Sequence, residues 1–381
     1  MNGVSGDVAI CGGGLIGLSL AFELAERGAT VRVFERGEPG RAASWAGAGL
    51  LAPYSESLHG DAMLALGTAS LEEYPAFVRR VEDAGGVDVR LHLDGVVRAA
   101  FAPEQCKALG AQQRDLHARG VPSELLDRSQ VLAAEPWIGH DVSEALLVHD
   151  EGWIDNRRLG RALVAASQAR GVSISQTSSL RVECDTRRVL GVATDDGFIA
   201  AGAVVNACGA WAAQLPGVPA SCVAPVEPVK GQMLALSVPP HFVQRAAWLA
   251  GIYLVPRDDP RLLVGATVES AGFDERVTAH GIDALLHAAL TAAPSLGAFS
   301  VTETWAGLRP GSPDGLPFLG STPIAGYFLA TGHYRNGILL TPVTARLVAD
   351  AVEGKADEAL TAFSLSRLGT EERAPRRTLS A

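Results

Sequence analysis

The sequence has little of what marks secreted, membrane-spanning or metal-binding proteins. Its five cysteines are scattered through 381 residues without a CxxC pair, a pattern typical of free thiols in a reducing cytoplasm rather than of disulfides or a zinc site. No uninterrupted apolar run approaches the roughly 20 residues needed to span a bilayer, and the first residues lack the basic stretch of a signal peptide. We therefore predict a cytoplasmic protein without a membrane partner or a bound metal.

Basic residues are also scarce. The 32 lysines and arginines are outnumbered by 42 aspartates and glutamates, which leaves a net charge of −10. A nucleic-acid-binding surface needs a basic surplus to neutralise phosphates, so this balance argues against a nucleic-acid partner. Core material, in contrast, is abundant, because 48% of the residues are hydrophobic. A chain of this length exceeds one average domain and predicts two.

Residues 7–35 have the pattern of a complete βαβ unit. An apolar strand at 7–11 leads into a glycine turn, a helix follows at 18–27, and a second strand covers 30–34. This alternation is typical of a parallel sheet with helices packed on it.

Residues 60–140 read mainly as amphipathic helices, and two kinds of passage follow them. Residues 158–212 again alternate helix and strand, and a strand at 327–332 precedes a helix at 342–352. Residues 225–303 consist mainly of strands, one of them expected at 262–269. The pattern predicts an α/β protein in which N- and C-terminal pieces of a nucleotide-binding fold enclose a β-rich insertion.

The glycine turn of the first βαβ unit carries the pattern of a dinucleotide-binding site. Gly12, Gly14 and Gly17 follow a strand and open a helix, where backbone must approach a pyrophosphate. Glu35 ends the next strand, 18 residues after Gly17, and offers acceptors for ribose hydroxyls. An acidic residue there disfavours a 2′-phosphate, so the pattern predicts an ADP-containing cofactor other than NADP.

Two further stretches favour a flavin over a nicotinamide. Residues 36–53 form a loop rich in small residues, which lets backbone approach a flat ring system. Residues 331–342 place a strand end, a glycine turn and a helix start in sequence. The positive end of such a helix would stabilise negative charge on a reduced flavin.

One arginine has no packing reason to be where it is. Arg309 lies among turn-formers and apolar residues in the stretch 305–320. The prolines and glycines that follow it restrict the backbone, and a guanidinium fixed in this way suits bidentate binding of a carboxylate. The sequence therefore predicts a carboxylate-binding site at Arg309.

Together these residues resemble the FAD-dependent D-amino-acid oxidase family, and within it the glycine oxidases. The resemblance runs from about residue 7 to 355. It is carried by the motifs Gly12-Gly13-Gly14-Leu15-Ile16-Gly17, Ala48-Gly49-Leu50-Leu51-Ala52-Pro53, Pro228-Val229-Lys230-Gly231-Gln232, Tyr253-Leu254-Val255-Pro256-Arg257, Val264-Gly265-Ala266-Thr267, Trp305-Ala306-Gly307-Leu308-Arg309-Pro310-Gly311 and Gly332-His333-Tyr334-Arg335-Asn336-Gly337.

The resemblance implies a Rossmann-like FAD-binding domain, discontinuous over 1–85, 145–220 and 320–363. A mainly antiparallel substrate-binding domain takes 86–144 and 221–319, and 364–381 form a flexible tail. Arg309 would bind the substrate carboxylate, Tyr253 would add a hydroxyl contact, and Arg335 would lie near substrate and flavin. The residues alone favour Tyr253 as a core residue with a satisfied hydroxyl, and Arg335 could equally be a partner in a structural ion pair. The residues implied to bind FAD are Gly12, Gly14, Leu15, Ile16, Gly17, Glu35, Arg36, Ala43, Ser44, Ala48, Gly49, Leu50, Ser179, His333, Tyr334, Arg335, Asn336, Gly337, Ile338 and Leu339.

The resemblance also implies how the cofactor and the substrate are held. Covalently flavinylated relatives attach FAD through a cysteine in the arginine loop, and the loop after Arg309 has none, so FAD should be bound non-covalently. Leu50, Gly251 and Val268 are expected around the substrate. Glycine at 251 would open the pocket to sarcosine or a larger D-amino acid.

The implied reaction is oxidation of a small amino acid by hydride transfer to FAD. Glycine, or sarcosine or a small D-amino acid, would give a 2-oxo acid, ammonia and hydrogen peroxide, with molecular oxygen as second substrate. The resemblance further implies a homo-oligomer whose product is used for thiazole synthesis in the thiamine pathway. Two alternatives stay open: a D-amino-acid or sarcosine-type dehydrogenase with a non-oxygen acceptor, and a flavin-binding scaffold without turnover.

Overall fold

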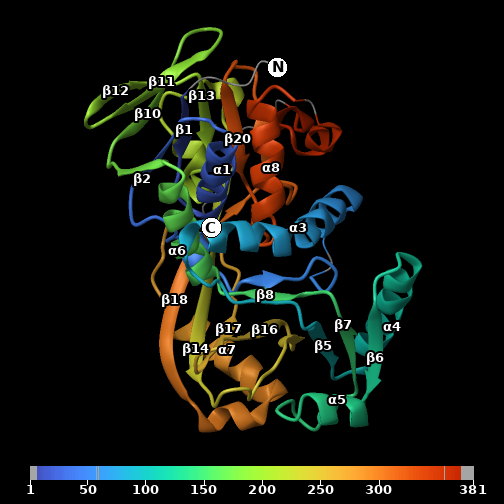
Figure 1. The fold of residues 1–381 in the computed structure, drawn as a ribbon. Coiled ribbons are helices and arrows are strands. Elements are labelled where there is room, and N and C mark those ends of the chain that lie inside the picture. Colours follow the sequence, from blue (N-terminus) through green and yellow to red (C-terminus); the bar gives the residue numbers. More distant parts are fainter. Residues whose placement is uncertain (1–6, 57, 59, 356, 370–381) are drawn as a thin grey trace.

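The computed structural model describes residues 7–56, 58, 60–355 and 357–369, which form two lobes, one above the other in the view of Figure 1. One lobe is built on a six-stranded sheet and the other on an eight-stranded sheet. The long strands β14 (Glu227–Ser237) and β18 (Ser300–Gly311) run from the second lobe toward the first. This mixed α/β architecture agrees with the fold class that the sequence predicts.

The six-stranded sheet is parallel except at one edge. Its order is β19-β20-β13-β1-β2-β9, and only β19 runs antiparallel to its neighbour. Residues alternate between its two faces, so that Val8 and Ile10 join the core under the helices while Ala9 and Cys11 face the opposite side. The strands are β1 (Val8–Cys11), β2 (Val31–Glu35), β9 (Ser173–Gln176), β13 (Ala203–Asn206), β19 (Phe318–Ser321) and β20 (Tyr327–Thr331).

Helices cover one face of this sheet, and a small sheet covers the other. The helices are α1 (Leu15–Glu26), α3 (Asp61–Gly85), α6 (Asn156–Ala169) and α8 (Thr341–Val352). The small sheet is β10 (Leu180–Cys184), β11 (Val189–Thr194) and β12 (Gly197–Ala200).

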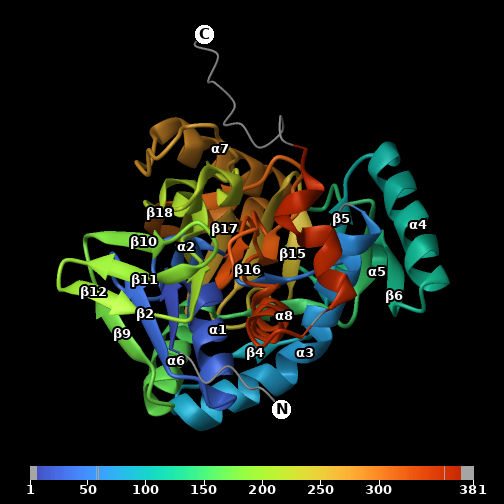
Figure 2. The same cartoon turned by 90° about the horizontal axis from the view of Figure 1, so that it is seen from above.

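The eight-stranded sheet is mainly antiparallel, in the order β18-β14-β17-β16-β15-β5-β7-β6. Seen from above, α4 and β6 project to one side of the molecule (Figure 2). Helix α7 packs on one face through an apolar cluster that includes Leu234 and Leu285, and the opposite face is turned toward the first lobe. The remaining elements of this lobe are β5 (Val96–Ala100), α4 (Pro103–Ala118), β6 (Ser123–Asp127), α5 (Arg128–Ala134), β7 (Glu144–Val148), β15 (Ala246–Leu249), β16 (Ile252–Pro256), β17 (Arg261–Gly265) and α7 (Ala279–Ala292).

Short elements complete the chain. A three-stranded sheet, β3-β8-β4, lies between the lobes. Its strands are β3 (Leu50–Leu51), β4 (Leu91–His92) and β8 (Gly152–Ile154), and α2 (Ala43–Ala46) precedes it in the chain. Among the described residues, five 3-10 turns occupy Gly209–Gln214, Ala220–Cys222, Pro294–Ala298, Glu358–Phe363 and Leu365–Arg367. Among the residues that the structure describes, no helix combines the length and the apolar composition that crossing a membrane requires.

The C-terminal segment differs in part from the expected flexible tail. Leu365 and Leu368 are buried, and Arg367 pairs with Asp314 at 2.7 Å. The prediction of a tail beginning at 364 is wrong for residues 364–369, because a short apolar repeat and one ion pair dock them against the first lobe. Residues 370–381 lie outside the described residues.

Candidate functional site

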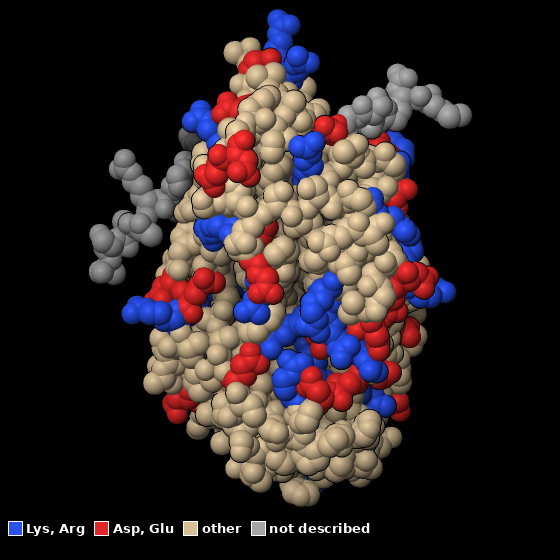
Figure 3. All heavy atoms as spheres, turned by 60° about the vertical axis from the view of Figure 1, so that its left-hand side comes forward, with Lys and Arg blue, Asp and Glu red and all other residues tan. Residues whose placement is uncertain are grey.

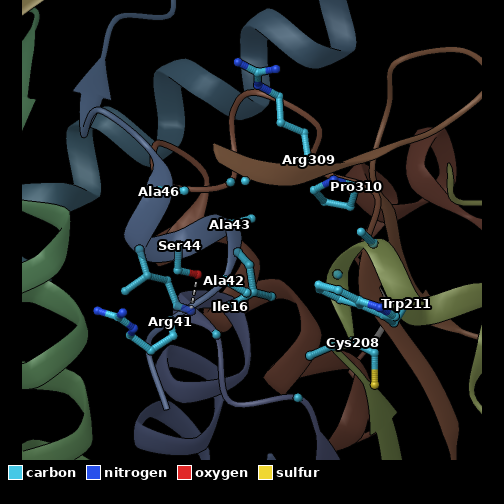
Figure 4. A pocket seen from close by; sticks show the side chains of 18 of the residues that line it. Ile16, Arg41, Ala42, Ala43, Ser44, Ala46, Cys208, Trp211, Arg309 and Pro310 are labelled. Atoms are coloured by element: carbon cyan, nitrogen blue, oxygen red, sulfur yellow. Dashed lines mark hydrogen bonds between the residues drawn. The ribbon is translucent and has the colours of Figure 1, made fainter. Parts of the chain in front are cut away.

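A cavity of about 780 Å³ lies where the two lobes meet. Its walls come from α1, the loop after β2, helix α2, the end of β13, strands β14, β15, β16 and β18, and the segment after β20. Figure 4 shows Ile16, Ser44 and Trp211 at one end of it and Arg309 at the other. The cavity therefore joins the glycine turn of the first lobe to the arginine of the second.

The glycine turn and the N-terminus of α1 lie in the wall of this cavity. Gly12 and Gly14 line it, and no side chain caps the helix at Gly14. A Cβ on Gly12 would overlap the backbone of Ala207, so only glycine fits between the two strands. Ser44 Oγ accepts the Leu15 N–H at 2.9 Å and ties the small-residue loop to the helix start (Figure 4). A helix N-terminus that faces a cavity suits a pyrophosphate.

Glu35 stands beside the turn with both carboxylate oxygens directed at backbone. Oε2 accepts the Gly13 N–H at 2.7 Å, and Oε1 accepts the Gly37 N–H at 2.9 Å. Each oxygen keeps a second lone pair for a ribose hydroxyl, because a carboxylate has about four acceptor positions. Across the same end of the cavity, the Arg36 guanidinium lies 4.7 Å from the Trp211 ring centroid.

The floor of the other end is one face of the eight-stranded sheet. Directly opposite residues of antiparallel strands share a face, and the register aligns five positions in one row. From edge to interior the row is Trp305 on β18, Met233 on β14, Gly265 on β17, Tyr253 on β16 and Trp248 on β15. Large side chains therefore cover the row except at Gly265, over which the Tyr253 ring lies.

Arg309 lies on the same face as this row. Its Nη1 donates to the carbonyl oxygens of Lys230, at 3.2 Å, and Thr267, at 3.0 Å. A Cβ on Gly231 would overlap the guanidinium, so the missing side chain at 231 makes the space in which the guanidinium lies. Two carbonyls thus fix one end of the planar guanidinium, and its other end faces the cavity beside Tyr253, where a carboxylate could bind.

Tyr253, Arg335 and Glu56 surround the guanidinium end of the cavity. Burial raises the pKa of Tyr253, an effect opposed by the charges of Arg309 and Arg335, so its hydroxyl keeps its proton as a donor. Arg335 Nε lies 2.8 Å from Glu56 Oε1. Burial likewise raises the pKa of Glu56, and Arg335 and Arg309 oppose that shift. The ion pair that the sequence left open for Arg335 is therefore present, and it lies within the cavity wall.

Most of the predicted site residues line the cavity together. These are Gly12, Gly14, Leu15, Ile16, Glu35, Arg36, Ala43, Ser44, Ala48, Gly49, Leu50, Ser179, Tyr253, Arg309, His333, Tyr334, Arg335, Gly337 and Ile338. His333 is buried against Thr344, at 3.1 Å, and burial lowers its pKa to about 3, so it is neutral.

Three of the predicted cofactor residues lie behind that wall instead. Gly17 packs against the Gly12 carbonyl oxygen and brings α1 close to β1. Leu339 is 2% exposed and belongs to the core under the helices. Asn336 is buried, and its Oδ1 has no partner among the described residues.

Two residues expected around the substrate do not reach it. Val268 is 56% exposed, and Gly251 occupies the exposed turn between β15 and β16. Both predictions are wrong because β17 ends at Gly265, before the expected end at 269, and because a turn residue between two strands faces solvent. Of the three, only Leu50 lines the cavity.

Sequence reasoning missed many residues of the cavity wall, among them five with side chains that bear on its shape or charge. Cys208 and Trp211 follow β13, where the buried strand running into a glycine turn was a usable signal. Glu56, Met233 and Trp248 carried no local signal, because strand register and a long-range ion pair bring them together. The Cys208 thiol is buried, which raises its pKa to about 12.

Comparisons with known proteins agree with this geometry. Glycine oxidase of Pseudomonas aeruginosa is 37% identical over 352 residues, covering 91% of this chain and 95% of the relative. The crystal structure of glycine oxidase from Geobacillus kaustophilus matches with a TM-score of 0.91 at 36% identity, covering 96% of this chain and 99% of that one. A bifunctional ThiO/ThiG protein of Trichormus variabilis is 37% identical over 95% of this chain, which spans about half (55%) of that relative's length.

The family assignment covers nearly the whole described chain. The model of the FAD dependent oxidoreductase family, DAO, matches residues 7–351. This range includes the glycine turn, Glu35, Arg309 and the segment after β20. FAD is the cofactor of the family, and the helix N-terminus at the glycine turn, the acidic ribose acceptor and the small-residue loop fit it. The chain is a member of the DAO family of FAD dependent oxidoreductases.

Proposed function

We propose that the protein oxidises glycine with FAD and molecular oxygen, and that sarcosine and small D-amino acids are further substrates. Glycine, oxygen and water would give glyoxylate, ammonia and hydrogen peroxide. The observation that carries the proposal is Arg309, whose guanidinium is fixed over Gly231 beside the Tyr253 hydroxyl in the FAD cavity. The glycine oxidases at 36–37% identity support the choice of substrate.

Arg309 and Tyr253 would hold the substrate carboxylate. The free donors of the guanidinium offer a bidentate contact, and the protonated Tyr253 hydroxyl offers a further one. Holding the carboxylate at two points also orients Cα, which hydride transfer requires more than it requires an acid or base. Among the described residues, the cavity wall near Arg309 holds no histidine other than the neutral, buried His333.

The charge at the Arg309 end of the cavity favours the amino acid with a neutral amine, which is the form that can lose hydride. Two guanidinium groups, Arg309 and Arg335, face one carboxylate, Glu56, which leaves one positive charge in excess. An amino acid with a neutral amine carries one negative charge and matches this excess better than the zwitterion does. The neutral amine keeps the lone pair that forms the imine as hydride leaves Cα.

Bound FAD would accept this hydride and pass the electrons to oxygen. The residues that would hold it are those of the glycine turn, Glu35 on the ribose and the segment 333–338 at the flavin end. We further propose that it is bound non-covalently, that the first-lobe segments 1–85, 145–220 and 320–363 form the FAD-binding domain, and that 86–144 and 221–319 form the substrate-binding domain. A cytoplasmic homo-oligomer belongs to the same proposal.

A substrate panel tests the proposal. Purified protein with bound FAD would be mixed with glycine, sarcosine, D-alanine and D-proline in air, and oxygen consumption and peroxide release would be measured together. The proposal predicts peroxide equimolar with oxygen consumed, and glycine among the best substrates. Substrate oxidation only with an added quinone, and without peroxide, would identify the dehydrogenase alternative. A yellow protein that none of the four compounds reduces would be a binding scaffold.

We also propose that the product serves thiazole synthesis in the thiamine pathway. The names of the bifunctional ThiO/ThiG relatives support this, since a fused second protein would receive a labile imine before water hydrolyses it. A bacterial strain that lacks its glycine oxidase and needs added thiazole tests the proposal. Growth without thiazole when this chain is expressed is expected, and continued dependence would contradict it.

A further inference from the structure

The row of side chains on the cavity floor ends at Trp248. Trp248 lies opposite Tyr253 in the β15–β16 pair, and the two rings meet edge to face with centroids 5.1 Å apart. The next strand places Arg98 opposite Trp248, but Arg98 does not line the cavity. Trp248 is therefore the last side chain of the row that the cavity reaches.

Two contacts hold the indole in place. The Tyr253 ring packs on one side of it, and the Arg335 guanidinium lies 5.6 Å from its centroid, within the range of a cation–π interaction. Arg335 is itself paired with Glu56 at 2.8 Å. An indole held between an aromatic ring and a paired guanidinium cannot move aside readily, so it acts as a wall of fixed position.

The indole also has an unused donor. Trp248 Nε1 is buried and has no hydrogen-bond partner among the described residues, whereas Trp305, at the other end of the row, donates from Nε1 to the Ala46 carbonyl oxygen at 2.9 Å. Tryptophan N–H groups usually find a partner when they are buried. Trp153 has the same unpartnered Nε1, so this donor alone assigns no role, and what distinguishes Trp248 is that its side chain lines the cavity.

We propose that Trp248 is a specificity-determining residue that limits the substituent on the substrate Cα to the size of hydrogen or methyl. The inference rests on the proposed function, because it takes the substrate carboxylate to lie between Arg309 and Tyr253. From that position Trp248 is the next side chain along the row, so a larger substituent directed away from Arg309 meets the indole face. Gly251 therefore does not open the site, since it lies outside the cavity.

Trp153 provides a matched control. It belongs to the same apolar cluster, its Nε1 is likewise without a partner among the described residues, and the Arg257 guanidinium lies 5.1 Å from its ring centroid. It does not line the cavity. Trp153→Leu therefore reproduces the loss of a tryptophan from this cluster without removing a residue of the cavity wall.

The test compares Trp248→Leu, Trp248→Phe and the control with the parent, all loaded with FAD. The first readout is kcat/KM for D-phenylalanine divided by that for glycine. The second is binding of non-oxidisable carboxylates, measured as the dissociation constant of acetate divided by that of phenylacetate from the change in flavin absorbance. Both ratios should rise at least about tenfold in Trp248→Leu, less in Trp248→Phe, which keeps an aromatic face for Arg335, and not in Trp153→Leu.

The outcomes separate this inference from the proposed function. Unchanged ratios in a folded, FAD-loaded Trp248→Leu would overturn the inference while glycine oxidation by the parent stands. An equal rise in Trp153→Leu would also overturn it, because the effect would then come from the cluster and not from the wall. Absence of glycine oxidation in the parent would contradict the proposed function, and the ratio of carboxylate dissociation constants would still decide on Trp248.

Discussion

Replacing Arg309 by methionine removes the proposed carboxylate anchor and keeps a long apolar stem. The structure predicts a loss specific to substrate, because Arg309 Nη1 donates to the carbonyl oxygens of Lys230 and Thr267, while the guanidinium otherwise meets the Tyr253 side chain at the cavity wall. FAD is held elsewhere, by the glycine turn and Glu35, so the variant should still purify with bound FAD.

The expected magnitude follows from the two contacts that are lost. A hydrogen bond involving a charged group contributes about 1.5–3 kcal/mol, so a bidentate pair contributes about 3–6 kcal/mol. At about 1.4 kcal/mol for each factor of ten, Arg309→Met should lower kcat/KM for glycine by about 10²- to 10⁴-fold. Arg309→Lys keeps the charge without the planar fork and should fall between the variant and the parent.

Steady-state peroxide release at varied glycine gives kcat/KM, and the flavin absorbance of each preparation gives its FAD content. Thermal unfolding shows whether the Lys230 and Thr267 carbonyls, left without Arg309, weaken the fold. A folded Arg309→Met protein with full FAD content and a kcat/KM close to that of the parent would refute the assignment of Arg309.

Three further predictions concern other parts of the cavity and its supports. Gly231→Ala should leave stability nearly unchanged but raise KM for glycine, because the added Cβ would displace the end of the flexible Arg309 side chain. Gly297→Ala is the control, since its Cβ meets only ordinary contacts. An unchanged KM in Gly231→Ala would contradict the geometry. Glu35→Gln should weaken FAD binding by about ten- to a hundredfold, measured by fluorescence titration of the apoprotein, since a charged acceptor for ribose is lost; an unchanged dissociation constant would exclude Glu35 as that acceptor. Burial raises the pKa of Glu151 to about 7 from 4.5, so the folded state holds this proton more tightly than the unfolded state does. The free energy of unfolding should therefore fall by about 3 kcal/mol through this group as pH rises from about 5 to 8. Over that interval the denaturant midpoint of Glu151→Gln should rise relative to that of the parent, and a constant difference between the two midpoints would contradict the shift.

The sequence predicted those parts of the molecule that short segments determine. The βαβ unit at 7–35 follows from strand, glycine turn and helix in immediate succession, and β1, α1 and β2 confirm it. Arg309 could be singled out because the apolar and turn-forming residues around it give no packing reason for an arginine at this position. Each of these signals lies within about 30 residues of sequence.

The missing parts depend on contacts between distant segments. Alternation along a strand shows which residues share a face, but register decides which residues of neighbouring strands meet, and the row from Trp305 to Trp248 is set by four strand pairs. The pairing of Glu56 with Arg335 joins positions 279 residues apart and has no local signature. The same limit explains Val268, since the end of β17 at Gly265 could not be located from apolar alternation alone.

Anaerobic mixing of the FAD-loaded protein with glycine tests the central claim most directly. The account predicts that the flavin absorbance near 450 nm, the usual band of oxidised flavin, is lost on mixing and returns on admission of air, with one peroxide formed for each flavin reoxidised. Flavin that keeps its absorbance in saturating glycine, while the protein is folded and fully loaded, would contradict the account.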